Sequence, residues 1–184
     1  MKMRTGLLLA AGLLAAACVP GCAKKTYRCP TSAMLPTMGP DDIFAAERDP
    51  YRDRAPARGD VIVFEVPESA PPNFRGSSVK RLIGLPGDRI ALAGYRVVAN
   101  GDTLDEPYIA IPPEDQRRTG GSAPGDMEEL VVPDGHCYAL GDNRGNSLDS
   151  RYYGPVPLAS IEARATVIVR SPDEDRVGRR LSPP

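Results

Sequence analysis

Short runs of apolar and β-branched residues, separated by turn residues, are the feature that most constrains how this chain can fold. The sequence contains 18 glycines and 20 prolines among its 184 residues, and amphipathic helix patterns of useful length are absent after the N-terminal segment. Asn100 and Gly101 directly follow one of the runs and are a strong hairpin signal, because both residues tolerate positive φ. The pattern therefore favours a mostly β domain. Its predicted strands span residues 60–66, 78–85, 89–92, 95–99, 137–140 and 163–169.

The length of the chain is enough for one domain with a hydrophobic core and too short for two of ordinary size. Residues 66–76 and 112–125 are rich in proline, serine or glycine and are predicted to be loops. The C-terminal tail mixes charge with proline and carries little apolar surface, so we expect it to be disordered. The predicted organisation is an N-terminal signal or short membrane anchor at residues 1–22, a β domain at 26–170 and a disordered tail at 171–184.

Charge and metal-binding residue types narrow the classes of function. The 23 basic and 24 acidic residues nearly cancel, so the chain has no overall field that would recruit nucleic acid, and we expect no nucleic-acid partner. No cysteine or histidine pair has the spacing of a zinc site, and the sequence predicts neither a metal nor a cofactor. The one histidine, His136, lies at the start of a predicted strand, where a turn or surface role is expected.

Residues 1–22 have the properties of an export signal. Lys2 and Arg4 precede an uncharged run, residues 6–19, that matches the charged and apolar regions of a secretory signal. As a helix this run of 14 residues would be about 21 Å long, short of the roughly 30 Å hydrocarbon core of a bilayer. Small residues precede both Cys18 and Cys22, which resembles a bacterial lipoprotein processing site. Lipid attachment, a short uncleaved anchor and simple secretion therefore remain three alternatives.

Cys29 and Cys137 lie after the predicted signal, and an extracytoplasmic location would permit a disulfide between them. Cys29 adjoins residues 30–38 and Cys137 lies shortly before residues 141–151, so such a bridge would join these two segments. The alternative is two buried thiols that never meet. We favour the second interpretation because disulfide connectivity cannot be deduced from sequence.

Four segments follow one another in an order that resembles one enzyme family. Residues 30–38 read PTSAMLPTM, residues 58–64 read RGDVIVF, residues 79–88 read VKRLIGLPGD and residues 141–151 read GDNRGNSLDSR. Together they resemble the active-site boxes of the type I signal peptidases, and the last segment is the most specific of the four. Members of that family cut peptides with a serine nucleophile and a lysine base, without a histidine and aspartate triad.

The resemblance implies a fold, an activity and partners. The fold would be a folded antiparallel β-sheet or barrel core in a single compact domain. Larger members carry a second β domain where this chain has residues 112–125, so that domain is expected to be reduced to a loop. The implied activity is that of a serine endopeptidase, a hydrolase whose partners are preprotein signal peptides and the lipid surface of the membrane. The catalytic domain would lie on the extracytoplasmic side of the cytoplasmic membrane.

The resemblance also assigns chemistry to individual residues. Lys80 matches the family's general base, and a lysine with an ordinary pKa of about 10.4 must lose its charge near neutral pH to accept a proton. Lys80 lies among apolar residues of a predicted core strand, and burial lowers the pKa of a lysine. The oxyanion would be bound by the hydroxyl of Thr31 and the backbone N–H of Ala33.

Three residues of the last segment match supporting roles. Ser147 would hydrogen-bond the lysine amine and orient its lone pair. Asp149 and Arg151 would form an ion pair that holds the loop in shape. Turn formation is the alternative role, because serine and aspartate are common turn formers in any protein.

Ala33 stands where the resemblance places the serine nucleophile. A methyl group cannot attack a carbonyl, and losing the nucleophile costs on the order of 10⁶ in kcat in other serine proteases. Ser32 is the candidate substitute nucleophile, although neighbouring side chains of an extended segment point to opposite sides. An engineered or erroneous alanine codon is a further explanation.

Three classes of function stay open. The first is an active or impaired signal peptidase that uses Ser32 with Lys80. The second is a pseudoprotease that binds signal peptides without cutting them, or a lipoprotein-anchored interaction protein. The third is a self-cleaving repressor-type protein with a serine and lysine dyad, which the predicted export signal and residues 141–151 disfavour.

Overall fold

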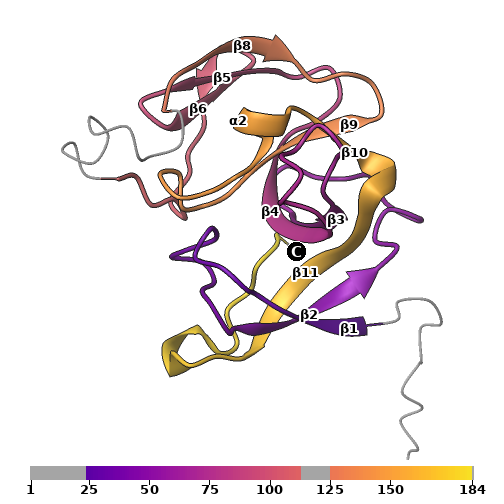
Figure 1. Cartoon of the computed structure of the whole chain (residues 1–184), viewed down its shortest axis with the longest axis vertical. Coiled ribbons are helices and arrows are strands. Elements are labelled where there is room, and N and C mark those ends of the chain that lie inside the picture. Colours follow the sequence, from indigo (N-terminus) through magenta and orange to yellow (C-terminus); the bar gives the residue numbers. More distant parts are fainter. Residues whose placement is uncertain (1–23, 113–124, 184) are drawn as a thin grey trace, which may run out of the picture.

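The computed structural model describes residues 24–112 and 125–183, which form mainly two antiparallel β-sheets (Figure 1). The larger sheet has seven strands in the order β1-β2-β11-β3-β4-β9-β10. The mostly β fold expected from the sequence is thereby confirmed. The strands of this sheet are β1 (Lys24–Arg28), β2 (Ile43–Arg48), β3 (Val61–Glu65), β4 (Ser77–Gly84), β9 (His136–Leu140), β10 (Val156–Pro157) and β11 (Ile161–Arg170).

The smaller sheet has four strands in the order β7-β6-β5-β8 and lies above the larger one in Figure 1. Asn100 and Gly101 join β6 to β7 with φ angles of 56° and 93°, so the predicted hairpin is confirmed. Its strands are β5 (Arg89–Ala93), β6 (Arg96–Ala99), β7 (Asp102–Thr103) and β8 (Met127–Val131). The short helical segments are α2 (Ser150–Tyr153), η1 (Leu158–Ser160) and η2 (Glu174–Arg176).

The six predicted strands correspond to β3, β4, β5, β6, β9 and β11. The predicted loop at residues 66–76 joins β3 to β4. The predicted ranges do not include β1, β2, β8 or the two-residue strands β7 and β10. Strands β1 and β8 expose most of their side chains, so neither shows a hydrophobic signal. They are held by main-chain pairing, β1 with β2 and β8 with β5.

Strand β3 is covered on both faces, which explains its continuous apolar sequence. Val61 and Val63 belong to one buried cluster, and the alternating residues Ile62 and Phe64 belong to a second. A third cluster joins the two sheets, with Ile83 and Tyr138 of the larger sheet packed among the apolar residues of the smaller one. Gly84 lies at this junction, where a Cβ atom would come within 2.9 Å of Ile90.

The C-terminal tail differs from the sequence prediction. Leu181 is buried in the first cluster. The hydroxyl of Ser182 accepts a hydrogen bond from Val61 N at 2.8 Å and donates one to the carbonyl oxygen of Ala165 at 2.7 Å. The prediction of disorder is therefore wrong for residues 171–183. Composition failed here because one buried leucine, the Ser182 hydroxyl and main-chain hydrogen bonds, such as that from Leu181 N to the carbonyl oxygen of Thr166 at 3.0 Å, hold a segment that is otherwise polar.

Several predictions fall on parts of the chain that the structure does not describe. The predicted signal or anchor at residues 1–22, with Cys18 and Cys22, lies outside the described residues. So does most of the predicted loop at 112–125, which was expected to replace a second β domain. Within the described ranges, no helix has the length and hydropathy needed to cross a membrane.

Cys29 and Cys137 are free, buried thiols. They belong to different core clusters, Cys29 to the first and Cys137 to the second. Burial raises the pKa of both thiols, that of Cys137 to about 12. The structure thus contains the two separate thiols that we favoured over a bridge.

Candidate active site

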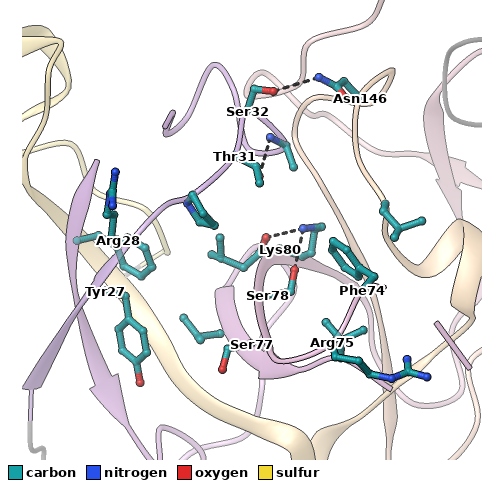
Figure 2. A pocket seen from close by; sticks show the side chains of 17 residues that line it. Tyr27, Arg28, Thr31, Ser32, Phe74, Arg75, Ser77, Ser78, Lys80 and Asn146 are labelled. Atoms are coloured by element: carbon teal, nitrogen blue, oxygen red, sulfur yellow. Dashed lines mark hydrogen bonds between the residues drawn. The ribbon is translucent and has the colours of Figure 1, made fainter. Parts of the chain in front are cut away.

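A cavity of about 410 Å³ lies between residues 30–33 and the first half of β4. Figure 2 shows Lys80 next to Ser78 in this cavity, with Thr31 and Ser32 on the segment above them. Apolar side chains, including those of Val79 and Leu148, form much of the remaining wall. The cavity therefore combines an apolar lining with a small number of polar groups, as binding sites for peptides and small molecules do.

Lys80 projects from β4 and is only 3% exposed. Loss of hydration lowers the pKa of its amine below the ordinary 10.5, an effect that the negative charge of Asp149 partly opposes. Its Nζ donates hydrogen bonds to Ser78 Oγ at 2.9 Å and to the carbonyl oxygen of Val79 at 3.0 Å. The lowered pKa increases the neutral fraction of the amine at neutral pH, which is what a general base requires.

Residues 30–33 form another wall of the cavity, and the rest of the segment, residues 34–38, packs behind them in the protein. Met34 and Met38 are fully buried in the first core cluster and anchor the segment. The backbone N–H of Ala33 contacts Thr31 Oγ1 at 3.4 Å, a long hydrogen bond that leaves the N–H weakly engaged. The two donors that the resemblance assigns to the oxyanion therefore lie side by side at the cavity.

Ser32 points away from Lys80 (Figure 2). Its hydroxyl accepts a hydrogen bond from Asn146 Nδ2 at 3.0 Å, and its carbonyl oxygen accepts one from Asn143 Nδ2 at 3.1 Å. The structure therefore does not bring the candidate substitute nucleophile to the amine of Lys80. The sequence argument assumed an extended segment, but residues 31–38 form bends and turns, with Leu35 N donating to the Ser32 carbonyl oxygen at 3.1 Å. The two asparagine contacts hold Ser32 against the loop of residues 141–151.

Asp149 and Arg151 form the ion pair that the resemblance implies, and both side chains are fully buried. Arg151 Nε and one terminal nitrogen each donate to an Asp149 oxygen at 2.8 Å. Asp149 also accepts a hydrogen bond from Gly141 N at 3.0 Å and caps the first turn of α2. The pair therefore fixes the loop of residues 141–151 against the end of β9.

Ser147 is buried, and its hydroxyl has no hydrogen-bond partner among the described residues. A Cβ atom at Gly141 would overlap Ser147 Oγ and lie 2.5 Å from the carbonyl oxygen of Ala33. Only glycine fits between these two segments. The expected hydrogen bond from Ser147 to the lysine amine is not present in this structure, in which Lys80 bonds Ser78 and the carbonyl oxygen of Val79.

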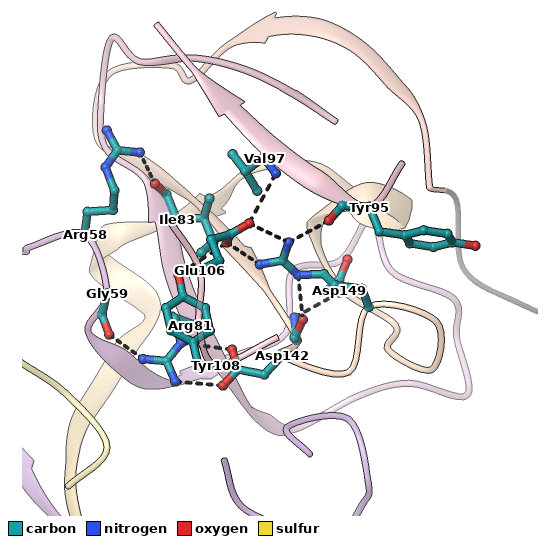
Figure 3. Close-up of polar contacts among 12 residues, drawn as sticks. Arg58, Gly59, Arg81, Ile83, Tyr95, Val97, Glu106, Tyr108, Asp142 and Asp149 are labelled. Carbon is teal, nitrogen blue, oxygen red and sulfur yellow. Dashed lines mark hydrogen bonds and ion pairs between the residues drawn. The ribbon is translucent and has the colours of Figure 1, made fainter. Parts of the chain in front are cut away.

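Two further buried ion pairs hold Arg81, the residue after Lys80, and the loop of residues 141–151 in place. Sequence reasoning missed both pairs. Arg144 pairs with Glu106 with both side chains fully buried, and one of the two hydrogen bonds between them measures 3.1 Å. Arg81 binds Asp142 through two hydrogen bonds of 2.9 and 2.7 Å and lies 3.9 Å from the ring of Tyr108 (Figure 3). The partners are 38 and 61 positions apart, so no local pattern in the sequence connects them.

Comparison with known proteins identifies the family. Residues 2–170 match the family described as signal peptidase, peptidase S26. The chain belongs to the signal peptidase family. It is 37% identical over 158 residues to the signal peptidase I of Leptolyngbya laminosa, covering 84% of this chain and 72% of that one. It is 40% identical over 139 residues to a Synechocystis protein named "Probable signal peptidase I-2", covering 75% of this chain and 59% of that one.

A crystal structure of a signal peptidase I from Enterococcus faecalis V583 covers 61% of this chain and 98% of that chain, with 31% identity and a TM-score of 0.46. The chain spans 59% of the Synechocystis relative and 72% of the Leptolyngbya relative. Family membership therefore rests on the sequence matches.

Ser78 is the residue of this family member that sequence reasoning missed. It lies on β4 two positions before Lys80, so both side chains lie on the same face of the strand. Its hydroxyl is half-buried, lines the cavity and contacts the lysine amine. The i, i+2 spacing of a serine and a lysine on a predicted strand was the signal that could have revealed the contact.

Proposed function

We propose that this chain is a signal-peptidase-type serine endopeptidase that removes N-terminal signal peptides from exported proteins. The observation that carries the proposal is the buried amine of Lys80 in hydrogen-bond contact with a serine hydroxyl, in a cavity beside residues 30–38. Membership of the signal peptidase family supports the reaction and the class of substrate. The proposed location is the outer face of the cytoplasmic membrane, with the predicted signal or anchor of residues 1–22 holding the chain at the lipid surface.

The described side chains supply most parts of a serine and lysine mechanism. Neutral Lys80 would accept the proton of an attacking hydroxyl and later give it to the leaving amine. Thr31 and the N–H of Ala33 would donate hydrogen bonds to the oxyanion of the tetrahedral intermediate. The Asp149 and Arg151 pair would hold the loop that closes the cavity. The remaining part is the nucleophile, because position 33 carries only a methyl group.

A second candidate function is a pseudoprotease that binds signal peptides without cutting them. The methyl group of Ala33 favours it, since the family position for the nucleophile is unable to form an acyl-enzyme. The cavity and its oxyanion donors would still bind an extended peptide in this case. The two candidates differ in whether the unmodified chain cuts.

The proposal is tested with the full chain in detergent micelles and a preprotein substrate. Ala33→Ser restores the missing oxygen and is expected to cut fast at the signal peptide junction, while Lys80→Met in that background is expected to reduce cutting to background. Slow cutting by the unmodified chain supports the endopeptidase, and tight binding without cutting supports the pseudoprotease. If Ala33→Ser neither cuts nor binds preproteins, the proposed function is wrong.

A further inference from the structure

The geometry points to Ser78 as the nucleophile of this chain, paired with Lys80, in place of the hydroxyl missing at position 33. This inference rests on the proposed endopeptidase function and names a catalytic residue for it. The observation behind it is the 2.9 Å contact between Ser78 Oγ and Lys80 Nζ inside the cavity. When the amine is neutral, the hydroxyl can donate the hydrogen bond to Nζ at the same heavy-atom distance, because that distance does not fix which atom carries the proton.

Other nucleophilic groups near the cavity are committed elsewhere. The hydroxyl of Ser32 accepts a hydrogen bond from Asn146, and that of Thr31 lies beside the N–H of Ala33, where its role is to donate to the oxyanion. The thiol of Cys29 donates to the carbonyl oxygen of Thr31 at 3.2 Å, and burial raises its pKa, which keeps it protonated. Among the described residues, Ser78 is the hydroxyl that contacts the base.

Ser147 does not compete with Ser78 for this role. Its hydroxyl is buried without a partner among the residues that the structure describes, whereas Ser78 is partly exposed and lines the cavity. A nucleophile must be both accessible and bonded to its base. Ser78 meets the two requirements together.

Strand β4 gives this pair a rigid support. Ser78 is paired with Phe64 and Lys80 with Ile62 on the neighbouring strand β3, so both Cα atoms are fixed by the ladder. Functional groups on strands are held more firmly than groups on loops. The contact between hydroxyl and amine is therefore built into the sheet and does not depend on residues 30–38.

The chemical steps balance without any added group. Ser78 Oγ attacks the scissile carbonyl carbon while its proton passes to Lys80 Nζ, and the carbonyl oxygen becomes an oxyanion. Thr31 and the N–H of Ala33 are the donors that the same cavity offers to that oxyanion. The C–N bond then breaks, and the amine leaves with the proton from Lys80. Water attacks the ester, passes a proton to Lys80, and Ser78 regains its hydrogen as the acid departs.

The first test compares cutting rates of the full chain on one preprotein peptide. Ser78→Ala is expected to lower the slow cutting of the unmodified chain at least about a hundredfold, because it removes the nucleophile. Ser77→Ala is the matched control, since Ser77 is exposed and bonded to Glu162 at 2.8 Å. The double variant Ala33→Ser with Ser78→Ala is expected to cut, which shows that the fold and the base survive the loss of Ser78.

The second test locates the covalent bond. An activated ester of a short alanine-containing peptide is incubated with the unmodified chain, which is then digested with trypsin and analysed by mass spectrometry. The acyl group is expected on Ser78 in the fragment of residues 76–80, and Ser77→Ala removes the ambiguity between the two serines. An acyl group on Ser32 in the fragment of residues 29–48 would overturn the inference.

The outcomes separate this inference from the proposed function. If Ala33→Ser cuts preproteins while the unmodified chain is neither active nor acylated, the assignment of Ser78 is wrong and the proposed site stands. If Ser78→Ala cuts as fast as the unmodified chain, the assignment is also wrong. If Ser78 is acylated but Ala33→Ser does not process preproteins, the assignment of Ser78 as nucleophile with Lys80 as base is supported, and the proposed substrate is wrong.

Discussion

Asn146 Nδ2 donates a hydrogen bond of 3.0 Å to the hydroxyl of Ser32. This contact joins residues 30–38 to the loop of residues 141–151 and orients the Ser32 hydroxyl toward that loop, away from Lys80 (Figure 2). The asparagine amide therefore binds the hydroxyl that the sequence analysis named as a substitute nucleophile. Turning the Ser32 hydroxyl toward Lys80 would break this bond.

Ser32→Ala is expected to change the cutting rate of the unmodified chain by less than about fivefold, because it removes one hydrogen bond of about 1 kcal/mol. The rate is measured on a preprotein peptide by chromatography of the products. Asn146→Ala is the companion variant and is expected to have an effect of the same size, since it removes the other partner. A rate at background for Ser32→Ala alone would instead assign the nucleophile to Ser32.

The cutting rate of Ala33→Ser is expected to rise with pH through the pKa of Lys80. Only the neutral amine accepts a proton, and burial lowers its pKa below the ordinary 10.5, so the rising limb should lie at lower pH than for an exposed lysine. The measurement is kcat/KM from about pH 5 to pH 10, with unfolding excluded by circular dichroism at each pH. A limb centred near the ordinary lysine pKa would contradict the assignment of Lys80 as a buried base.

Lys80→Met is expected to raise the thermal stability at neutral pH. Because the folded-state pKa of Lys80 lies below the unfolded value, the unfolded chain binds more protons between the two, and stability rises with pH across that window. The destabilisation is complete below the folded-state pKa and is lost above about 10.5. Each kcal/mol gained by Lys80→Met raises Tm by about 2–4 °C in a chain of this size.

The control for this stability measurement is Lys24→Met, because Lys24 is exposed on the edge strand β1. It is expected to leave Tm unchanged at every pH. A Tm for Lys80→Met that equals the unmodified value at neutral pH and also at pH 10 would show that the amine is hydrated in solution.

Glu106→Gln is expected to destabilise the fold. It leaves the guanidinium of Arg144 buried without its charged partner, which costs about 3–5 kcal/mol for pairs of this kind. Thermal unfolding followed by circular dichroism measures the change in Tm. The matched control is Glu129→Gln, which breaks the exposed pair with Arg89 and is expected to have no resolvable effect. Equal changes for the two variants would contradict the structural role of the buried pair.

The strands that sequence reasoning found are those with continuous apolar or β-branched composition. In β3, Val61 to Phe64 are buried on both faces, so their hydrophobicity is visible in the sequence. The exposed residues of β1 carry no such signal, and β1 exists because its main chain pairs with β2. The tail was mispredicted because the Ser182 hydroxyl accepts a hydrogen bond from Val61 N and donates one to the carbonyl oxygen of Ala165, contacts that composition does not reveal.

The candidate site was predictable in its parts and unpredictable in its contacts. The motifs located Thr31, Ala33 and Lys80, which the structure brings to one cavity, and the ion pair of Asp149 and Arg151. They did not indicate that Lys80 would bond Ser78. The hydrogen-bond partner of Lys80 depends on which hydroxyl lies close to its amine in the folded sheet. The spacing of motifs in the sequence does not give that distance.

The sequence by itself determined the β-rich fold class, the family and the absence of a hydroxyl at position 33, because composition and motif order are properties of the chain. Only the tertiary structure decided the direction of Ser32, the contact between Ser78 and Lys80, and the burial that lowers the pKa of the Lys80 amine. These three depend on strand pairing and on exclusion of water, which arise when segments far apart in the sequence pack together.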